Sequence, residues 1–166
     1  MFGPDEIIVS KTDLKGRITY ANDVFQTIAG YEEDELLGQP HSIIRHPDMP
    51  RCVFKLLWDT LATGHEIFAY VINRCKNGDH YWVYANVTAS RGRDGNIISY
   101  HSSRTVPDRE IITRHIAPLY KTLRDAENRH PNAKQGMAAS GRLLGELLAQ
   151  NNMGYDEFLF SLSKAA

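Results

Sequence analysis

The sequence predicts an α+β fold in which short helices cover a five-stranded antiparallel sheet and an α-helical tail follows. Three observations lead to this prediction. Segments with strand patterns lie at both ends of the first hundred residues, with turn-forming residues between neighbouring strands. Segments rich in Gly and Pro separate the first two strands from the last three. Apolar residues at helical spacing then run through the remainder of the chain.

The first two predicted strands form a hairpin. Residues 7–10 are a short, largely apolar run, and residues 17–20 alternate between polar and apolar side chains. The Asp-Leu-Lys-Gly segment at 13–16 lies between them and has turn-forming residues at its two ends. We therefore expect one antiparallel pair at the start of the fold.

The middle of the chain predicts short helices. Two helical turns are expected over 23–30 and 32–37, each followed by or ending at a glycine. Three prolines within 40–50 exclude a long helix there. A longer amphipathic helix is expected after Pro50, and Gly64 ends it.

Three further strands follow in a meander. Residues 67–74 and 80–88 flank the Lys-Asn-Gly-Asp turn at 76–79, and Asn-Gly between strand patterns is a strong hairpin signal. A second turn at 93–96 leads to the last strand at 97–101. The crevice between this sheet and the short helices is the expected ligand site.

The tail carries three apolar stripes. The first contains Ile112, Ile116, Leu119 and Leu123, and a break at 128–132 precedes the other two. Such stripes must pack on one another, on the sheet or on another chain. We expect the first stripe to form a homodimer contact or the docking site for a partner protein.

Composition limits the possible functions. The net charge is −1, which gives no general attraction to nucleic acid or to an acidic membrane surface. No apolar run is long enough to cross a bilayer, and the first residues lack a signal-peptide core, so the expected location is the cytoplasm. Two cysteines, Cys52 and Cys75, with scattered histidines predict neither a disulfide framework nor a zinc site.

Two motifs then identify a family. The segments Ile-Arg-His-Pro-Asp-Met-Pro at 44–50 and Asn-Arg-Cys-Lys-Asn-Gly-Asp-His-Tyr-Trp at 73–82 resemble the flavin-binding PAS domain of bacterial aerotaxis receptors. The segment 116–121 is similar to the helix that follows this domain in the family, and 155–158 is similar to the tail of stand-alone PAS proteins of bipartite energy-taxis systems. In those systems a soluble PAS protein senses redox state through FAD, and a separate membrane transducer carries the signal. The resemblance implies a PAS sensor domain over 5–105 and a helical tail over 106–166.

The same resemblance implies bound FAD and six residues that hold it. They are Arg45, His46, Asp48, Trp58, Asn73 and, at the rim of the pocket, Asn22. The chemistry is compatible, because a diphosphate needs Arg and His donors and a flavin ring needs an aromatic face and an amide. One departure from the family pattern affects the pocket: the aromatic residue in Ile67-Phe68-Ala69 comes one position later and is expected to face away from it.

Each of these residues also has a structural interpretation. Arg45 and Asp48 could cap a helix or pair with each other, and His46 could be an ordinary surface histidine. Trp58 could simply pack in the core.

We expect a redox or oxygen sensor, without enzymatic activity, that signals to a chemotaxis-type transducer. No nucleophile accompanies His46 and Asp48, and no phosphate-binding loop is present. Two alternatives stay open: a haem-binding PAS gas sensor with His46 as axial ligand, and a cofactor-free PAS interaction module. A light sensor that forms a flavin–cysteine adduct needs a cysteine within 39–51, where the sequence has none.

Overall fold

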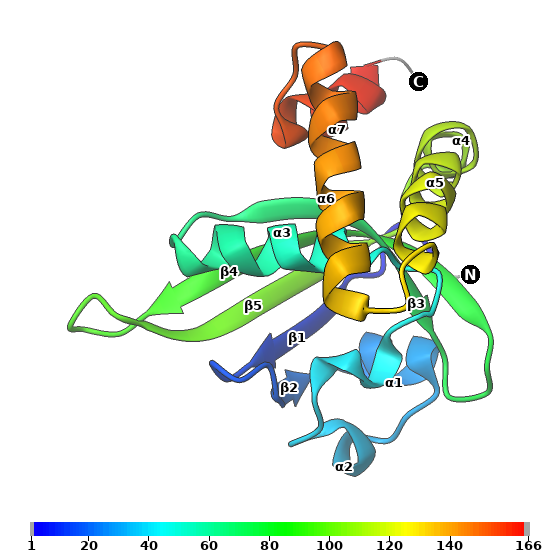
Figure 1. Ribbon diagram of the computed structural model, residues 1–166. Helices are drawn as coiled ribbons and strands as arrows, with labels where there is room; N and C mark the ends of the chain where they lie inside the picture. The colour runs from blue at the N-terminus through cyan, green and yellow to red at the C-terminus, as the bar shows by residue number, and fades with distance from the viewer. Residues whose placement is uncertain (1, 165–166) are drawn as a thin grey trace. The chain divides into compact units, whose positions relative to one another are not determined.

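One antiparallel sheet of five strands, in the order β2-β1-β5-β4-β3, organises the first part of the chain (Figure 1). The computed structural model describes residues 2–164. The strands are β1 (Ile8–Thr12), β2 (Ile18–Ala21), β3 (Ile67–Arg74), β4 (His80–Arg91) and β5 (Ile97–Thr105). The predicted hairpin and meander are therefore confirmed, and the last two strands are longer than expected.

The register of the strands defines two sheet faces. Ile8 lies opposite Arg104, Arg104 opposite Ala85, and Ala85 opposite Ala69, so these four side chains share one face. We call it the inner face, because α1 contacts it through Phe25, whose ring lies 4.7 Å from the Arg104 guanidinium carbon.

The opposite, outer face carries an aromatic group. The ring centroids of Phe68 and Tyr84 are 5.6 Å apart, and those of Tyr70 and Tyr84 are 4.8 Å apart. Phe68 thus faces away from Ile67 and Ala69, as the departure from the family pattern predicts.

Short helices connect β2 to β3. They are α1 (Asp23–Ala29), α2 (Glu33–Leu36), the 3₁₀ turn η1 (His41–Ile44) and α3 (Arg51–Ala62). The glycines at 30 and 38 have φ of 74° and 81°, a conformation that favours glycine and turns the chain after each short helix. Prolines at 40, 47 and 50 keep the segment between η1 and α3 non-helical.

The chain divides into two compact units. One contains the described residues up to His46 together with Thr60–Val106, and the other contains Pro47–Asp59 together with the described residues from Pro107 onward. The first residues of α3 therefore group with the helical tail, although they precede β3 in sequence.

The tail contains α4 (Arg109–Ile111), the π-helical turn η2 (Ile112–Ile116), α5 (Ala117–Asn128), α6 (Ala133–Gln150) and α7 (Tyr155–Lys164). The π turn ends at Ile116, two residues before Pro118, which has no N–H to donate to a preceding turn. Ile112, Ile116 and Leu123 are buried in the single chain, and Leu119 is half-buried. The first three are thus not an exposed surface for a second copy, which corrects the expected dimer contact.

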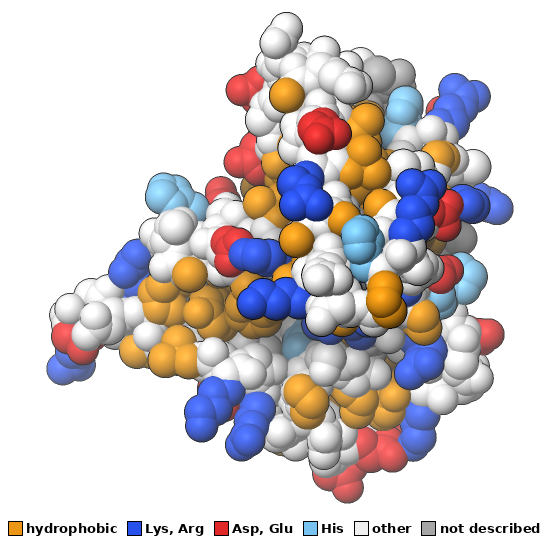
Figure 2. Space-filling model, in the orientation of Figure 1, with side chains coloured by type: hydrophobic (Ala, Val, Ile, Leu, Met, Phe, Trp, Pro, Cys, Tyr) orange, Lys and Arg blue, Asp and Glu red, His pale blue; other side chains and the backbone are white. Residues whose placement is uncertain are grey.

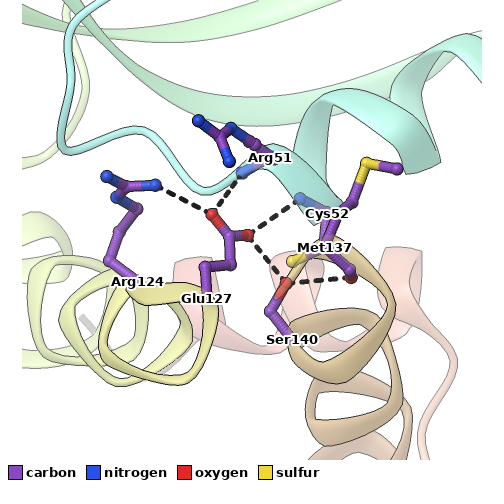
Figure 3. Close-up of polar contacts among 6 residues, drawn as sticks. All are labelled: Arg51, Cys52, Arg124, Glu127, Met137 and Ser140. Atoms are coloured by element: carbon purple, nitrogen blue, oxygen red, sulfur yellow. Dashed lines mark hydrogen bonds and ion pairs between the residues drawn. The ribbon is translucent and has the colours of Figure 1, made fainter. Parts of the chain in front are cut away.

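A buried carboxylate connects three helices of the second unit (Figure 3). Glu127 of α5, 3% exposed, accepts hydrogen bonds from the backbone N–H groups of Arg51 and Cys52 at 3.1 and 3.3 Å. It also accepts from the Ser140 hydroxyl of α6 at 2.7 Å and pairs with Arg124 at 3.0 Å. The negative charge lies at the N-terminus of α3, where the helix dipole and unused N–H groups favour it.

Charged side chains of both signs are interspersed over the face shown in Figure 2. The acidic group at the bottom of that view lies over α2, which carries Glu33, Asp34 and Glu35. Within residues 2–164, no helix combines the length and apolar character that crossing a membrane requires.

Candidate ligand-binding site

The inner face of the sheet buries a group of polar side chains where a small domain normally places apolar ones. Arg104 of β5 is 2% exposed, Ser10 of β1 is 1% exposed and Asn73 of β3 is 4% exposed. Tyr81 of β4 is buried as well. Buried polar groups lower stability unless they are hydrogen-bonded, so their partners decide what this cluster does.

A short hydrogen-bond chain holds Arg104 in place. Its Nη2 donates to the Ser10 hydroxyl at 2.7 Å, and Ser10 Oγ lies 3.0 Å from Nε2 of His41 in η1. Arg104 Nη1 lies 3.5 Å from the same His41 nitrogen. Because a guanidinium can only donate, Nε2 of His41 must be the acceptor, and the imidazole proton is assigned to Nδ1.

The environment keeps His41 neutral. Burial, followed by the positive charge of Arg104, lowers the pKa of His41 to about 3. Burial also lowers the pKa of Arg104, to about 10, which leaves the guanidinium charged at neutral pH. The cluster therefore contains one full positive charge.

Asn73 and Tyr81 lie opposite each other on neighbouring strands of the same face. Burial raises the pKa of the Tyr81 phenol to about 12, and Asn73 counteracts part of that rise. Neither Asn73 Nδ2 nor the Tyr81 hydroxyl forms a hydrogen bond of good geometry with any part of the chain that the structure describes. Both are donors available to a ligand that presents acceptors.

The structure brings three of the six predicted site residues next to this cluster. Residues Arg45 and Asn73 form an isolated antiparallel bridge, so the loop after η1 runs beside β3. The exposed Arg45 and half-buried His46 therefore lie beside the strand that carries Asn73. The His46 ring lies edge-on to His80, with centroids 5.8 Å apart.

Asn22 has a structural role that needs no ligand. Its side-chain oxygen accepts from the backbone N–H groups of Val9 and Phe25, both at 3.0 Å, and its amide donates to the Ile7 carbonyl at 2.9 Å. These bonds cap α1 and attach it to the start of β1. Its position at the rim of a flavin pocket stays a prediction.

The remaining two predicted residues, Asp48 and Trp58, belong to the second unit. Asp48 is exposed in the turn before α3, and Trp58 lies within α3 with 38% of its surface exposed. The interpretation of Trp58 as a residue packed in the core is therefore wrong. The contribution of both residues to a cofactor site stays a prediction.

Arg104, His41, Ser10 and Tyr81 were not predicted as site residues. The signal for Arg104 is its place in β5: it shares a face with Ser102, and it lies opposite Ile8 and Ala85. A charged residue at an inward strand position is unusual and indicates a functional role. The pairing that reveals it joins residues 94 positions apart and requires the register of β1 and β5.

The fold agrees with a known family. The PAS fold family matches residues 18–104, which run from β2 through almost all of β5. The chain therefore belongs to the PAS family, and the predicted PAS fold with C-terminal helices is confirmed.

Two curated proteins are similar to this chain in sequence. The aerotaxis receptor of Escherichia coli strain K12 is 44% identical over 144 residues, which cover 86% of this chain and 28% of the receptor. A nitrogen fixation regulatory protein of Klebsiella pneumoniae is 29% identical over 94 residues, covering 57% of this chain and 19% of that protein. The resemblance to aerotaxis receptors is thus confirmed, and the chain spans less than a third of either relative.

Solved structures agree on the fold. The dark structure of the blue-light photoreceptor Aureochrome1 LOV superposes with a TM-score of 0.57 at 24% identity, covering 72% of this chain and 86% of that one. A light-oxygen-voltage domain studied with a flavin analogue gives 0.58 at 21% identity, covering 75% and 87%. At this identity the similarity establishes the fold alone.

Proposed function

We propose that this chain is a cytoplasmic redox or oxygen sensor that binds FAD on the inner sheet face and signals to a chemotaxis-type transducer, without catalysis of its own. The observation that carries the proposal is the buried cluster of Arg104, Asn73 and Tyr81, in which all three side chains have donors available. The 44% identity with the E. coli aerotaxis receptor supports the sensory role.

The donor set fits a flavin. The pyrimidine edge of an isoalloxazine ring presents two carbonyl oxygens as acceptors and one N–H as a donor. Arg104, Asn73 and Tyr81 offer donors from neighbouring strands, and the Asn73 amide can also accept. Phe25 adds an aromatic surface beside Arg104. A bound flavin would supply reversible electron transfer, which changes the charge and protonation of its ring.

The preference for FAD over a shorter flavin depends on the loop after η1. Arg45 and His46 could neutralise a diphosphate, and the bridge between Arg45 and Asn73 places this loop beside the buried cluster. Asp48 and Trp58 complete the proposed set by resemblance to the family.

The protein's part in signalling would be a change in these hydrogen bonds. Asn73 can exchange donor for acceptor by rotating its amide, while Ser10 and His41 keep Arg104 in position. A shift at β3 or β5 would then reach the partner through the sheet and the tail. A homodimer through surfaces other than the buried stripe, and the transducer itself, are further parts of this proposal.

An absorbance spectrum of the freshly purified protein tests the proposal. Paired near-ultraviolet and blue bands, with release of FAD on denaturation, are expected. A Soret band would instead favour the haem sensor, and a protein that shows no bands and takes up no added FAD would favour the interaction module.

A further inference from the structure

We propose that Arg104 is a ligand-binding residue whose charge is balanced by the acceptor-rich edge of the bound flavin, with Ser10 and His41 as the residues that position it. This inference rests on the proposed function and assigns a role to a residue outside the six that the family resemblance implies.

First, Arg104 does not use all of its hydrogen-bond donors within the described part of the chain. A guanidinium has five N–H groups, and Arg104 directs one to Ser10 at 2.7 Å and another towards His41 at a long 3.5 Å. Its Nε–H has no hydrogen-bond partner in the described part of the chain. Arg104 therefore has donor capacity left for a planar, bidentate acceptor.

The second step is the balance of charge. Arg104 forms no ion pair with a carboxylate anywhere in residues 2–164; its neighbours are the Ser10 hydroxyl, the neutral His41 ring and the Phe25 ring face. Tyr81 could balance the charge of Arg104 only as a phenolate. It stays a neutral phenol, because burial raises its pKa to about 12. A buried charge without a counterion is unfavourable, so the site favours an anionic or strongly accepting ligand.

The third step is the surface around the guanidinium. Ala85 and Ala69 lie in line with Arg104 across β4 and β3, so the inner face beside Arg104 carries short side chains on the two neighbouring strands. Further along β3 and β4, Asn73 and Tyr81 add two more buried donors. Donors from three neighbouring strands match the two carbonyl oxygens of a flavin's imide edge, and the Asn73 amide or the Tyr81 hydroxyl can accept from the N3–H between them.

The test compares FAD binding to the parent protein with binding to Arg104→Met and Arg104→Lys. Met keeps the apolar stem and removes the charge, so we expect FAD affinity to fall about tenfold or more, the effect of losing a charged hydrogen bond. Lys keeps the charge without the planar fork, so we expect an intermediate affinity. Arg93→Gln, which removes an exposed charge from the β4–β5 turn, is the matched control and should bind as the parent does.

A second readout separates charge balance from simple packing. A positive charge beside the ring favours the electron-rich reduced flavin, so the midpoint potential in a dithionite titration should be lower in Arg104→Met than in the parent. Each tenfold change in the relative affinity for the two redox forms corresponds to about 30 mV for a two-electron couple.

The outcomes are distinct. Parent-like affinity and potential in Arg104→Met would overturn this inference and leave the flavin proposal intact, whereas a parent that binds no flavin would overturn the proposed function itself. Should Arg104→Met fail to fold, Arg104→Lys decides, and parent-like FAD affinity in that variant would refute the role of the guanidinium fork.

Discussion

The two buried charges of Glu127 and Arg104 differ in how far other groups of the chain balance them. Glu127, in the helical unit, accepts from two backbone N–H groups and a hydroxyl and pairs with Arg124. Arg104, in the sheet unit, has one short hydrogen bond, no carboxylate partner in residues 2–164 and an unused Nε–H. A charge that the fold balances internally is structural, whereas one left unbalanced indicates that something outside the chain completes it.

The largest effect on stability is expected at the balanced charge. Glu127→Ala leaves the Arg124 guanidinium and the first N–H groups of α3 without their acceptor. We therefore expect the free energy of unfolding to fall by about 3–5 kcal/mol, the usual result of breaking a buried pair. Urea denaturation measures it. As the control, Asp125→Ala removes the exposed partner of Lys121 and should lower the free energy of unfolding by about 1 kcal/mol or less. Equal losses in the two variants would show that Glu127 stabilises the protein no more than an exposed ion pair does.

The close approach of α5 and α6 should be the next most sensitive feature. A Cβ added at Gly136 would lie 2.5 Å from the Glu127 carbonyl oxygen, so Gly136→Ala should cost about 1–3 kcal/mol by overpacking. Gly145, in the same helix, has nothing within 4 Å of an added Cβ. Gly145→Ala should therefore stabilise by about 0.5–1 kcal/mol, and thermal unfolding of both variants checks the opposite signs.

The neutral His41 predicts loss of stability in acid. Its folded-state pKa of about 3 lies below the ordinary 6.5, so between these values the unfolded chain binds a proton that the folded chain does not. His41 therefore leaves the free energy of unfolding undiminished above pH 6.5 and lowers it as the pH drops towards 3. At pH 5 the free energy of unfolding is lower by about 2 kcal/mol.

His41→Gln should flatten the stability–pH curve in that window, measured by denaturation at pH 5 and pH 7. His115→Gln, at an exposed position, is the control and should keep the parent slope. An unchanged slope in His41→Gln would mean that His41 binds a proton equally readily in the folded and unfolded states, which would contradict the neutral His41 described above.

The smallest effect on stability is expected at the loop after η1. Arg45 is exposed, so Arg45→Ala should change the free energy of unfolding by about 0.5 kcal/mol or less. If the guanidinium holds a diphosphate, FAD occupancy should nevertheless fall sharply, as measured by the ratio of blue to protein absorbance. Full occupancy in the variant would remove Arg45 from the site.

The local pattern of the sequence was enough to predict most of the fold. The Asn-Gly turn before β4, the prolines around η1 and the Pro131 break between α5 and α6 act over a few residues, and their effects are confirmed. The ends of β4 and β5 were missed, because Ser90, Arg91 and Arg104 have no strong strand preference and are extended by pairing with neighbours.

The two buried charges could not be predicted, for a different reason. Glu127 meets Arg51 across 76 positions, and Arg104 meets Ser10 across 94, so no local window contains both partners. In a polar segment such as Ser-Ser-Arg-Thr, an arginine is most simply interpreted as exposed. The family motif indicated the neighbourhood of Asn73, whereas the buried donors around it follow from strand register.

The melting temperature with and without saturating FAD, in the parent and in Arg104→Met, tests the central claim most directly. A ligand that binds only the folded state raises stability in proportion to the logarithm of its occupancy, so the parent should melt higher with FAD. Arg104→Met should melt without FAD at or above the parent's temperature, because an unbalanced charge has been removed, and should gain much less from FAD. A variant that melts well below the parent without FAD, yet gains as much when FAD is added, would contradict the claim that the ligand balances Arg104.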